Sequence, residues 1–304
     1  MIRCTLRQLE YAVLVAEQGS VAAAALMLGV AQPSISVAIK KLEEQIGLQI
    51  FIRQHAQGVF PTPQGAEFLA DARRLLNQAQ ELERQHTDRG GPLRGRLHIG
   101  SFMTLTPVYV PMIISKFKTL YPDVDILLEE GVQEDLLGGL RSGRHDLALM
   151  YDVDLPADIQ AQEVASLKPY VLLPSKHRLA SIKRISLSSL ATENLILLDI
   201  QPSRTYFLRI LEAQGITPKI GFASASLELV RGMVGRGLGY SLLVTRPAGD
   251  QSYDGEKLAV CEIVGAVERG VVAIASLRQM RKTRAAQAFE KFCAAHFKEL
   301  SKPS

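Results

Sequence analysis

Side chains able to make close polar contacts with another surface are grouped in one short segment near the start of the chain. Pro33, Val37 and Lys40 fall on one face of the helix expected there, and Ser34 and Ser36 flank them. Hydroxyl groups donate and accept hydrogen bonds, an ammonium group attracts anions, and small side chains allow close approach. The pattern indicates a contact face rather than a reaction centre.

The helix that positions this face is predicted from the spacing of apolar residues. Ile35, Ile39, Leu42 and Ile46 recur at intervals of four, three and four, which places them on one buried side. Pro33 falls in the first turn, where a missing N–H removes no helical hydrogen bond. The small and polar side chains therefore project from the opposite side.

Two shorter helices are predicted before it. Apolar residues over 6–16 recur at intervals of three, four and three, which indicates the first helix. Gly19 then ends that helix and Ser20 caps the next one, an Ala-rich helix over 21–28 that ends at Gly29. Two helices joined by a tight turn containing glycine form the helix-turn-helix arrangement, whose second helix lies in the major groove of DNA. An ordinary three-helix subdomain fits the same pattern.

Two short strands and a long helix are predicted next. Residues 49–53 and 58–61 flank a polar turn as a wing would, and Thr62 and Pro63 cap and open a helix. Apolar residues then recur at heptad spacing, which suits a partner helix. They are Phe68, Ala72, Leu75, Ala79 and Leu82. Packing on its own domain is the alternative, but the break over 87–92 favours a dimerising linker helix.

Strands alternate with helices from residue 95 onward. Strands are predicted over 96–100, 124–129 and 146–151, with helices over 107–120 and 133–142 between them. The same alternation returns over 170–244, and a strand over 270–275 and a helix over 283–300 complete the chain. This rhythm predicts an α/β region with parallel sheets.

Length and composition limit the classes of protein. The 304 residues suffice for two domains, 47% of them are hydrophobic, and the net charge is only +4. Residues 1–92 carry nine basic and nine acidic side chains, whereas residues 269–304 carry eight and two, so the basic excess lies in the C-terminal tail. That tail is either a polyanion-binding surface or, as we expect, the solvated face of a terminal helix.

No arrangement in the sequence indicates catalysis or a metal site. Cys4, Cys261 and Cys293 lie far apart, the six His are scattered, and no GxSxG, Walker A or HExxH motif is present. The glycines over 232–239 follow a helix and precede a strand, the reverse of a dinucleotide-binding loop. The chain also shows no apolar signal segment and no membrane-length apolar run. We expect a cytoplasmic protein with no cofactor, no metal and no membrane partner.

Several motifs, in order over residues 6–65, together resemble one protein family. They are Leu6-Arg7-Gln8-Leu9-Glu10-Tyr11, Gly19-Ser20, Val30-Ala31-Gln32-Pro33-Ser34-Ile35-Ser36, Lys41-Leu42-Glu43, Gly47-Leu48 with Phe51 and Arg53, and Thr62-Pro63-Gln64-Gly65. This region is similar to the N-terminal domain of LysR-type transcriptional regulators. The remaining two thirds resemble the family's effector-binding domain, so the resemblance covers essentially the whole chain.

The resemblance implies a recognition helix and a wing that contact double-stranded promoter DNA. It assigns the DNA-facing residues as Gln32, Pro33, Ser34, Ser36 and Val37, with Lys40 and the wing residue Arg53 near phosphates. Gln can pair with adenine through two hydrogen bonds, and Ser reaches phosphates or base edges. For the two serines, helix capping or plain solvent exposure is the alternative.

Two positions depart from the family's pattern. Many members carry Arg or another polar residue where this chain has Val37, and an aromatic residue where it has Val21. Val37 suggests apolar contact with a thymine methyl group, or simply fewer polar contacts. The zero net charge of this domain implies modest affinity per subunit, so a dimer on two half-sites is expected.

The resemblance also implies a two-subdomain effector domain, hinged like a periplasmic solute-binding protein. Ligands of such open sheets bind beyond the carboxyl ends of strands, near helix N-termini. The candidate contacts are Ser101, Thr104, Val132, Gln133, Ser203, Arg204, Tyr206 and Ser224. Thr104 matches the hydroxyl residue that commonly holds an effector in the family, whereas Val132 stands where Thr is frequent.

The chemistry of these candidates suggests an anionic or carboxylate inducer. The guanidinium of Arg204 and a serine beside a helix start suit an anion, and Tyr206 or Phe207 could stack on an apolar body. Plainer roles compete: Ser203 and Ser226 as helix caps, and Arg204 paired with a surface carboxylate.

We therefore expect a LysR-type regulator that is not an enzyme, with an α/β fold overall. The expected units are a winged helix-turn-helix over 1–62, a linker helix and hinge over 63–92, and an effector domain over 93–304 that divides into 93–161 with 268–304 and 162–267. Expected partners are promoter DNA, a small-molecule effector and further copies in a homodimer or homotetramer, with RNA polymerase as another candidate. Effector binding would act through linkage to half-site spacing.

Two other classes of protein compete with this interpretation. A solute-binding protein on the same scaffold is disfavoured by the first ninety residues. An enzyme on the same scaffold is disfavoured by the lack of a catalytic constellation.

Overall fold

The computed structural model describes residues 4–54, 58–87 and 92–300. Three helices open the chain: α1 (Leu6–Gln18), α2 (Val21–Leu28) and α3 (Gln32–Ile46). The Ser20 side chain caps α2 by accepting from the Ala23 amide, and Gly19 before it has φ of 59°, a left-handed conformation that glycine adopts without strain. Glycine and a capping hydroxyl thus set the turns between the helices.

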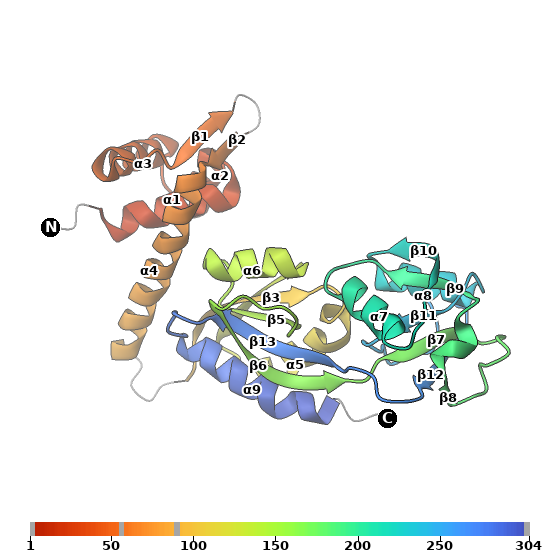
Figure 1. Cartoon of the computed structure of the whole chain (residues 1–304). Helices are drawn as coiled ribbons and strands as arrows, with labels where there is room; N and C mark the ends of the chain where they lie inside the picture. Colours follow the sequence, from red (N-terminus) through yellow and green to blue (C-terminus); the bar gives the residue numbers. More distant parts are fainter. Residues whose placement is uncertain (1–3, 55–57, 88–91, 301–304) are drawn as a thin grey trace.

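A two-stranded wing and a long helix complete the first unit. Strands β1 (Phe51–Gln54) and β2 (Gly58–Pro61) pair antiparallel, and α4 (Pro63–Thr87) follows them. The core holds side chains from α1, α3 and the first turns of α4. Among its most buried members are Ala12, Ile35, Leu42, Ile50 and Leu69. The predicted winged helix-turn-helix fold with a linker helix is confirmed (Figure 1).

The first effector subdomain, as we name it here, is built on a five-stranded sheet with the order β4-β3-β5-β13-β6. Its strands are β3 (Gly95–Phe102), β4 (Val124–Gly131), β5 (Leu147–Tyr151), β6 (Ile159–Leu167) and β13 (Gly270–Leu277). Its helices are α5 (Thr106–Leu120), α6 (Gln133–Arg141) and α9 (Arg284–Leu300). α6 covers one face of the sheet, and α5 and α9 cover the other (Figure 1).

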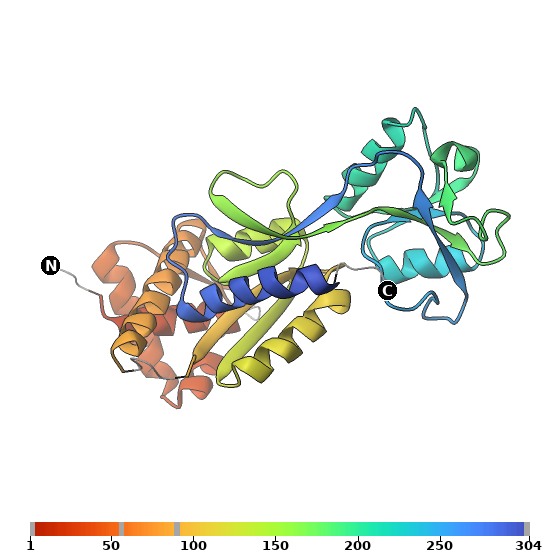
Figure 2. The same cartoon turned by 90° about the horizontal axis from the view of Figure 1, so that it is seen from below.

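The second effector subdomain holds a four-stranded sheet, β11-β7-β12-β8, beside the parallel pair β10-β9. Its strands are β7 (Tyr170–Pro174), β8 (Arg184–Ile185), β9 (Asn194–Leu198), β10 (Lys219–Ser224), β11 (Ser241–Leu243) and β12 (Leu258–Ile263). Its helices are the 3-10 turn η1 (Leu187–Leu190), α7 (Ser203–Glu212) and α8 (Leu227–Gly235). The segments around β6 and β13 connect the two subdomains, as Figure 2 shows from below.

The expectation of parallel sheets is only partly right. β3 pairs parallel with β4 and β5, but β13 runs antiparallel to β5 and β6, and β7 runs antiparallel to β11 and β12. β6, β8 and β12 were not predicted at all. The chain reverses strand direction because β13 returns from the second subdomain into the first, a route that no local pattern encodes.

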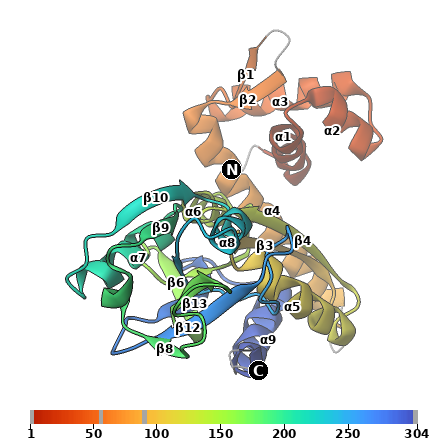
Figure 3. The ribbon, with the colours of Figure 1, turned by 90° about the vertical axis from the view of Figure 1, so that its right-hand side faces the viewer.

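The helix-turn-helix unit lies above the two effector subdomains when the molecule is seen from its side (Figure 3). α4 connects the two parts of the chain. Within the described residues, no single helix is both long and apolar enough to span a membrane.

Candidate DNA-binding face and effector pocket

One side of α3 is free of the domain core and carries the predicted DNA contacts. Gln32, Pro33, Ser34, Val37 and Lys40 are exposed, and Ser36 is half-buried. The opposite side carries Ile35, Ile39 and Leu42, all buried as their spacing predicted. The amphipathic pattern thus turns one row of amide, hydroxyl and apolar groups outward, and such a row can contact base edges and phosphates.

The wing is held beside α3 by one carboxylate. Glu43 on α3 accepts hydrogen bonds from the Ile50 amide at 2.7 Å and the Phe51 amide at 3.1 Å. Arg53 lies on β1, but its side chain is outside the described part of the chain. These two hydrogen bonds join the start of β1 to α3, so the wing begins beside the recognition face.

The five apolar residues predicted as a dimerisation seam on α4 do not form one free stripe. Ala72 is buried in the core of the winged domain, and Phe68 packs against that core. Leu75 and Leu82 are 46% and 59% exposed, and Ala79 is half-buried. The heptad spacing therefore serves two surfaces: the first turns pack on α1, and the later turns present leucines outward.

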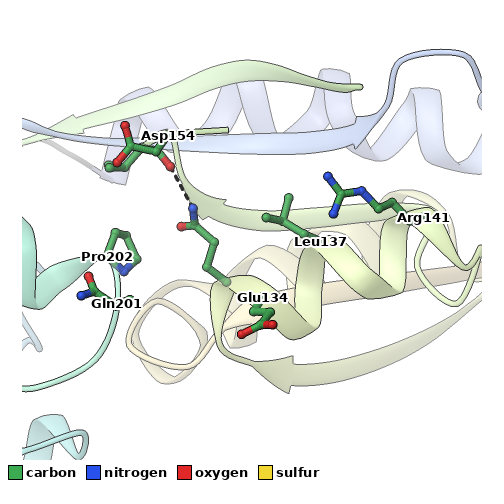
Figure 4. A pocket seen from close by; sticks show the side chains of 8 residues that line it. Glu134, Leu137, Arg141, Asp154, Gln201 and Pro202 are labelled. Atoms are coloured by element: carbon green, nitrogen blue, oxygen red, sulfur yellow. Dashed lines mark hydrogen bonds between the residues drawn. The ribbon is translucent and has the colours of Figure 1, made fainter. Parts of the chain in front are cut away.

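A pocket of about 290 Å³ lies between the two effector subdomains. The first subdomain contributes Gln133 and Glu134 at the start of α6, farther residues of that helix, and the loop after β5; the second contributes the turn before α7. The lining residues are Gln133, Glu134, Leu137, Arg141, Val153, Asp154, Gln201 and Pro202. Figure 4 shows these side chains around the pocket.

The polar side chains that line the pocket include both donors and acceptors of hydrogen bonds. Gln133 donates from Nε2 to the Val153 carbonyl at 2.8 Å, and its Oε1 is buried with no protein partner among the described residues. Glu134 and Asp154 add two carboxylates. The guanidinium of Arg141 is held by Asp158 at 2.8 and 3.1 Å, and these hydrogen bonds lower the pKa of the Asp158 carboxyl.

Of the candidate residues in the first subdomain, only Gln133 lines this pocket. Ser101 is fully buried and its hydroxyl accepts from Thr106 at 2.7 Å. Thr104 is buried as well, and its hydroxyl lies 3.5 Å from that of Tyr151. Val132 is half-buried directly before α6.

The candidates in the second subdomain have other partners. Tyr206 is buried and its hydroxyl donates to the Glu268 carbonyl at 2.6 Å, and Phe207 is buried too. Arg204 pairs with Asp199 at 2.7 Å, the plainer of its two expected roles. The structure therefore uses these side chains to fix α7.

The two expected helix caps before α7 and α8 have different outcomes. Ser226 caps α8 by accepting from the Leu229 amide. Ser203 is buried without a capping hydrogen bond at the start of α7. Ser224 accepts from the Ser226 amide at 3.1 Å. These hydroxyls thus organise the turn before α8 rather than forming one cluster with Arg204.

Sequence reasoning missed most of the pocket lining. Leu137 and Arg141 lie one and two turns after Gln133 on the same side of α6, so helical spacing from Gln133 could have found them. Gln201 and Pro202 directly precede the predicted Ser203 and Arg204. Asp154 has φ of 50° in the loop after β5, and no sequence signal marked it.

A hydrogen bond among the described residues connects the linker helix to the effector domain beside this pocket. The Arg74 guanidinium on α4 donates to the backbone carbonyl of Arg141 at 2.7 Å. The neighbouring Arg73 pairs with Glu17 on α1 at 3.3 Å. Two consecutive arginines on α4 thus contact the winged domain and the last turn of α6.

Among the described residues, no group of three His, Cys, Asp or Glu side chains is placed to hold a metal ion. Both Cys261 and Cys293 are buried, and burial raises the pKa of each thiol. The arrangement is one of contact surfaces and a ligand-sized pocket.

Two family descriptions match the chain. Residues 6–66 match the bacterial regulatory helix-turn-helix protein of the lysR family, and residues 90–298 match the LysR substrate binding domain. HinK, a LysR family transcriptional regulator from Pseudomonas aeruginosa, is 43% identical over 98% of this chain and 100% of its own, with a TM-score of 0.68.

Two further relatives are similar to this chain over nearly its whole length. A full-length OxyR variant from Pseudomonas aeruginosa is 27% identical, with a TM-score of 0.81 over 96% of this chain and 95% of its own. The uncharacterized HTH-type transcriptional regulator YybE of Bacillus subtilis is 29% identical over 96% of this chain and 99% of its own. The chain belongs to the LysR family of DNA-binding transcriptional regulators, with an N-terminal helix-turn-helix and a C-terminal substrate-binding domain.

Proposed function

We propose that the outward side of α3, with the wing, reads promoter DNA, and that a small molecule in the pocket between the effector subdomains controls this binding. The proposed DNA contacts are Gln32, Pro33, Ser34, Ser36, Val37, Lys40 and Arg53. The observation that carries the sensing part is that both subdomains line the same pocket. A ligand that contacts both favours the closed arrangement by its differential affinity.

The proposed units follow the course of the chain. Residues 1–62 bind DNA, 63–92 form the linker and hinge, and 93–161 with 268–304 and 162–267 form the two effector subdomains. The exposed Leu75 and Leu82 support a homodimer through α4, since exposed leucines on a linker helix gain stability when a second copy covers them. Two copies bound to two half-sites would raise the affinity for DNA. A homotetramer and a contact with RNA polymerase belong to the same proposal.

The ligand chemistry follows from the charges at the pocket. An anionic inducer was expected because of Arg204, but Asp199 pairs with that guanidinium and Asp158 pairs with Arg141. The carboxylates of Glu134 and Asp154 remain to accept hydrogen bonds. The pocket therefore suits a small molecule that carries N–H donors, and a carboxylate would first have to displace Asp199 from Arg204.

The coupling to DNA runs through α6. This helix carries pocket residues from its first turn to Arg141, whose carbonyl accepts from Arg74 on the linker helix. A ligand that shifts α6 also moves this contact. Control by linkage needs no chemical step in the chain.

The test is a thermal-shift screen of amines and carboxylates against full-length protein. We expect amine donors to raise the melting temperature of the wild type, and Glu134→Gln with Asp154→Asn to remove the effect. Arg204→Ala, the matched change outside the pocket lining, should keep it. Stabilisation by carboxylates that Arg204→Ala removes would restore the anionic inducer, and a screen in which no compound stabilises the wild type would contradict sensing at this pocket.

A further inference from the structure

Val37 is an exposed apolar residue at the centre of the α3 recognition face. Its side chain is 66% exposed, while Ile35 and Ile39 on the core side are buried. Pro33 lies one turn before it and Lys40 one turn after it. In the described part of the chain, nothing packs over the outer side of Val37.

A hollow of about 400 Å³ adjoins this side chain, between α3 and the wing. Its polar lining is Ser36, Lys40 and the Glu43 carboxylate, which the Ile50 and Phe51 amides already engage. Its apolar wall comprises Val15, Val21, Val37, Ile39, Phe51 and Val59. The small Val21 side chain leaves this space beside the recognition helix. The face therefore offers an apolar surface next to groups that can contact phosphate oxygens.

The edges of base pairs in the major groove carry one apolar group. Adenine, guanine and cytosine present hydrogen-bond donors and acceptors there, and thymine also presents its C5 methyl. Valine cannot satisfy donors or acceptors, so burying them against it costs binding free energy. A thymine methyl loses nothing by such burial and gains apolar contact.

We propose that Val37 is a specificity-determining residue that packs on a thymine methyl in each half-site. This inference rests on the proposed role of α3 as the DNA-reading helix. A duplex that lacks only this thymine methyl should bind about fourfold more weakly per half-site, because the burial of one methyl group against valine is lost.

The test replaces the methyl alone. Duplexes are first selected from a random pool with the full-length protein, and each thymine is then replaced singly by deoxyuridine, which pairs identically but lacks the methyl. Fluorescence anisotropy of each duplex should show one thymine per half-site whose replacement weakens binding about fourfold. In Val37→Ala the same replacement should have no effect.

A matched control separates this role from general apolar content. Leu26 on α2 is 85% exposed, and Leu26→Ala should retain the full deoxyuridine penalty. A penalty that persists in Val37→Ala, or a wild type indifferent to every replacement, overturns the inference while selective DNA binding stands. Failure of the selection to enrich any sequence overturns the proposed function of α3, and the inference with it.

Discussion

A pair of hydroxyl groups joins the two effector subdomains in the interior. Tyr151, at the end of β5, lies 2.6 Å from the Thr245 hydroxyl, which belongs to the second subdomain. Both residues are buried, and burial raises the pKa of Tyr151. The Tyr170 hydroxyl donates to the Thr245 carbonyl at 3.0 Å, so this residue is held from both sides.

Tyr151→Phe removes one oxygen and leaves the rest of the packing in place. The ring keeps its edge-on contact with Phe102 at 5.4 Å between centroids, so no cavity forms. The change leaves the buried Thr245 hydroxyl without this partner, which costs about 1–2 kcal/mol. With an unfolding slope of about 3 kcal/mol/M, the urea midpoint should fall by about 0.3–0.7 M.

The assay is urea unfolding of the full-length protein, followed by far-ultraviolet circular dichroism. Tyr253→Phe is the control, because this side chain is 85% exposed and its hydroxyl is solvated. We expect an unchanged midpoint for Tyr253→Phe. Equal midpoints for Tyr151→Phe and the wild type would show that this hydrogen bond does not stabilise the folded protein.

Three further predictions follow from packing and charge. Leu75→Glu with Leu82→Glu should shift the protein to a smaller species in analytical ultracentrifugation, because two charges would be buried in the proposed α4 dimer; an unchanged mass would exclude that contact. Gly65→Ala should destabilise the winged domain by more than about 2 kcal/mol in urea unfolding, because its Cβ would lie 2.1 Å from the Ile50 carbonyl oxygen; wild-type stability would contradict this geometry. Burial, helped by the nearby Tyr151, raises the pKa of Tyr109 to about 12, whereas unfolded tyrosine titrates near 10. The unfolded state therefore loses its proton first, so stability should fall between about pH 10 and 12, and Tyr109→Phe should lessen that fall.

The first domain could be predicted closely because its signals are local. Apolar spacing, a glycine after each helix and a capping Ser20 define α1 to α3, and the structure places the helix boundaries within two residues of those expected. Spacing alone could not assign the partner of α4. The same heptad pattern suits packing on α1 and packing on a second copy, and Ala72 does the former while Leu75 remains exposed.

The strands of the effector domain were harder to predict, because they depend on contacts between residues far apart in the sequence. β6 reads IQAQEVASL, without clean alternation, and its register against β13 shifts between Val272 and Ala273. The direction of β13 depends on the side from which the chain re-enters the first subdomain. The residues of β13 do not encode that side.

The sequence indicated the region of the pocket better than the residues that line it. Hydroxyl groups at strand ends were the expected ligand contacts, yet Ser101 and Thr104 bond within the protein. The helical spacing of Tyr206 and Ile210 could have placed Tyr206 on the buried side of α7. The pairing of Arg204 with Asp199 involves a residue five positions earlier, across a turn whose shape the sequence does not give.

We propose that the outward side of α3 makes this chain a sequence-selective DNA-binding protein. The most direct test is fluorescence anisotropy of the full-length protein with the duplex upstream of its own gene and with a scrambled duplex, over rising salt. We expect tighter binding to the upstream duplex, a loss of affinity with salt, and loss of the preference in Gln32→Ala with Ser36→Ala. Equal affinity for both duplexes, or a preference that the double variant retains, would contradict it.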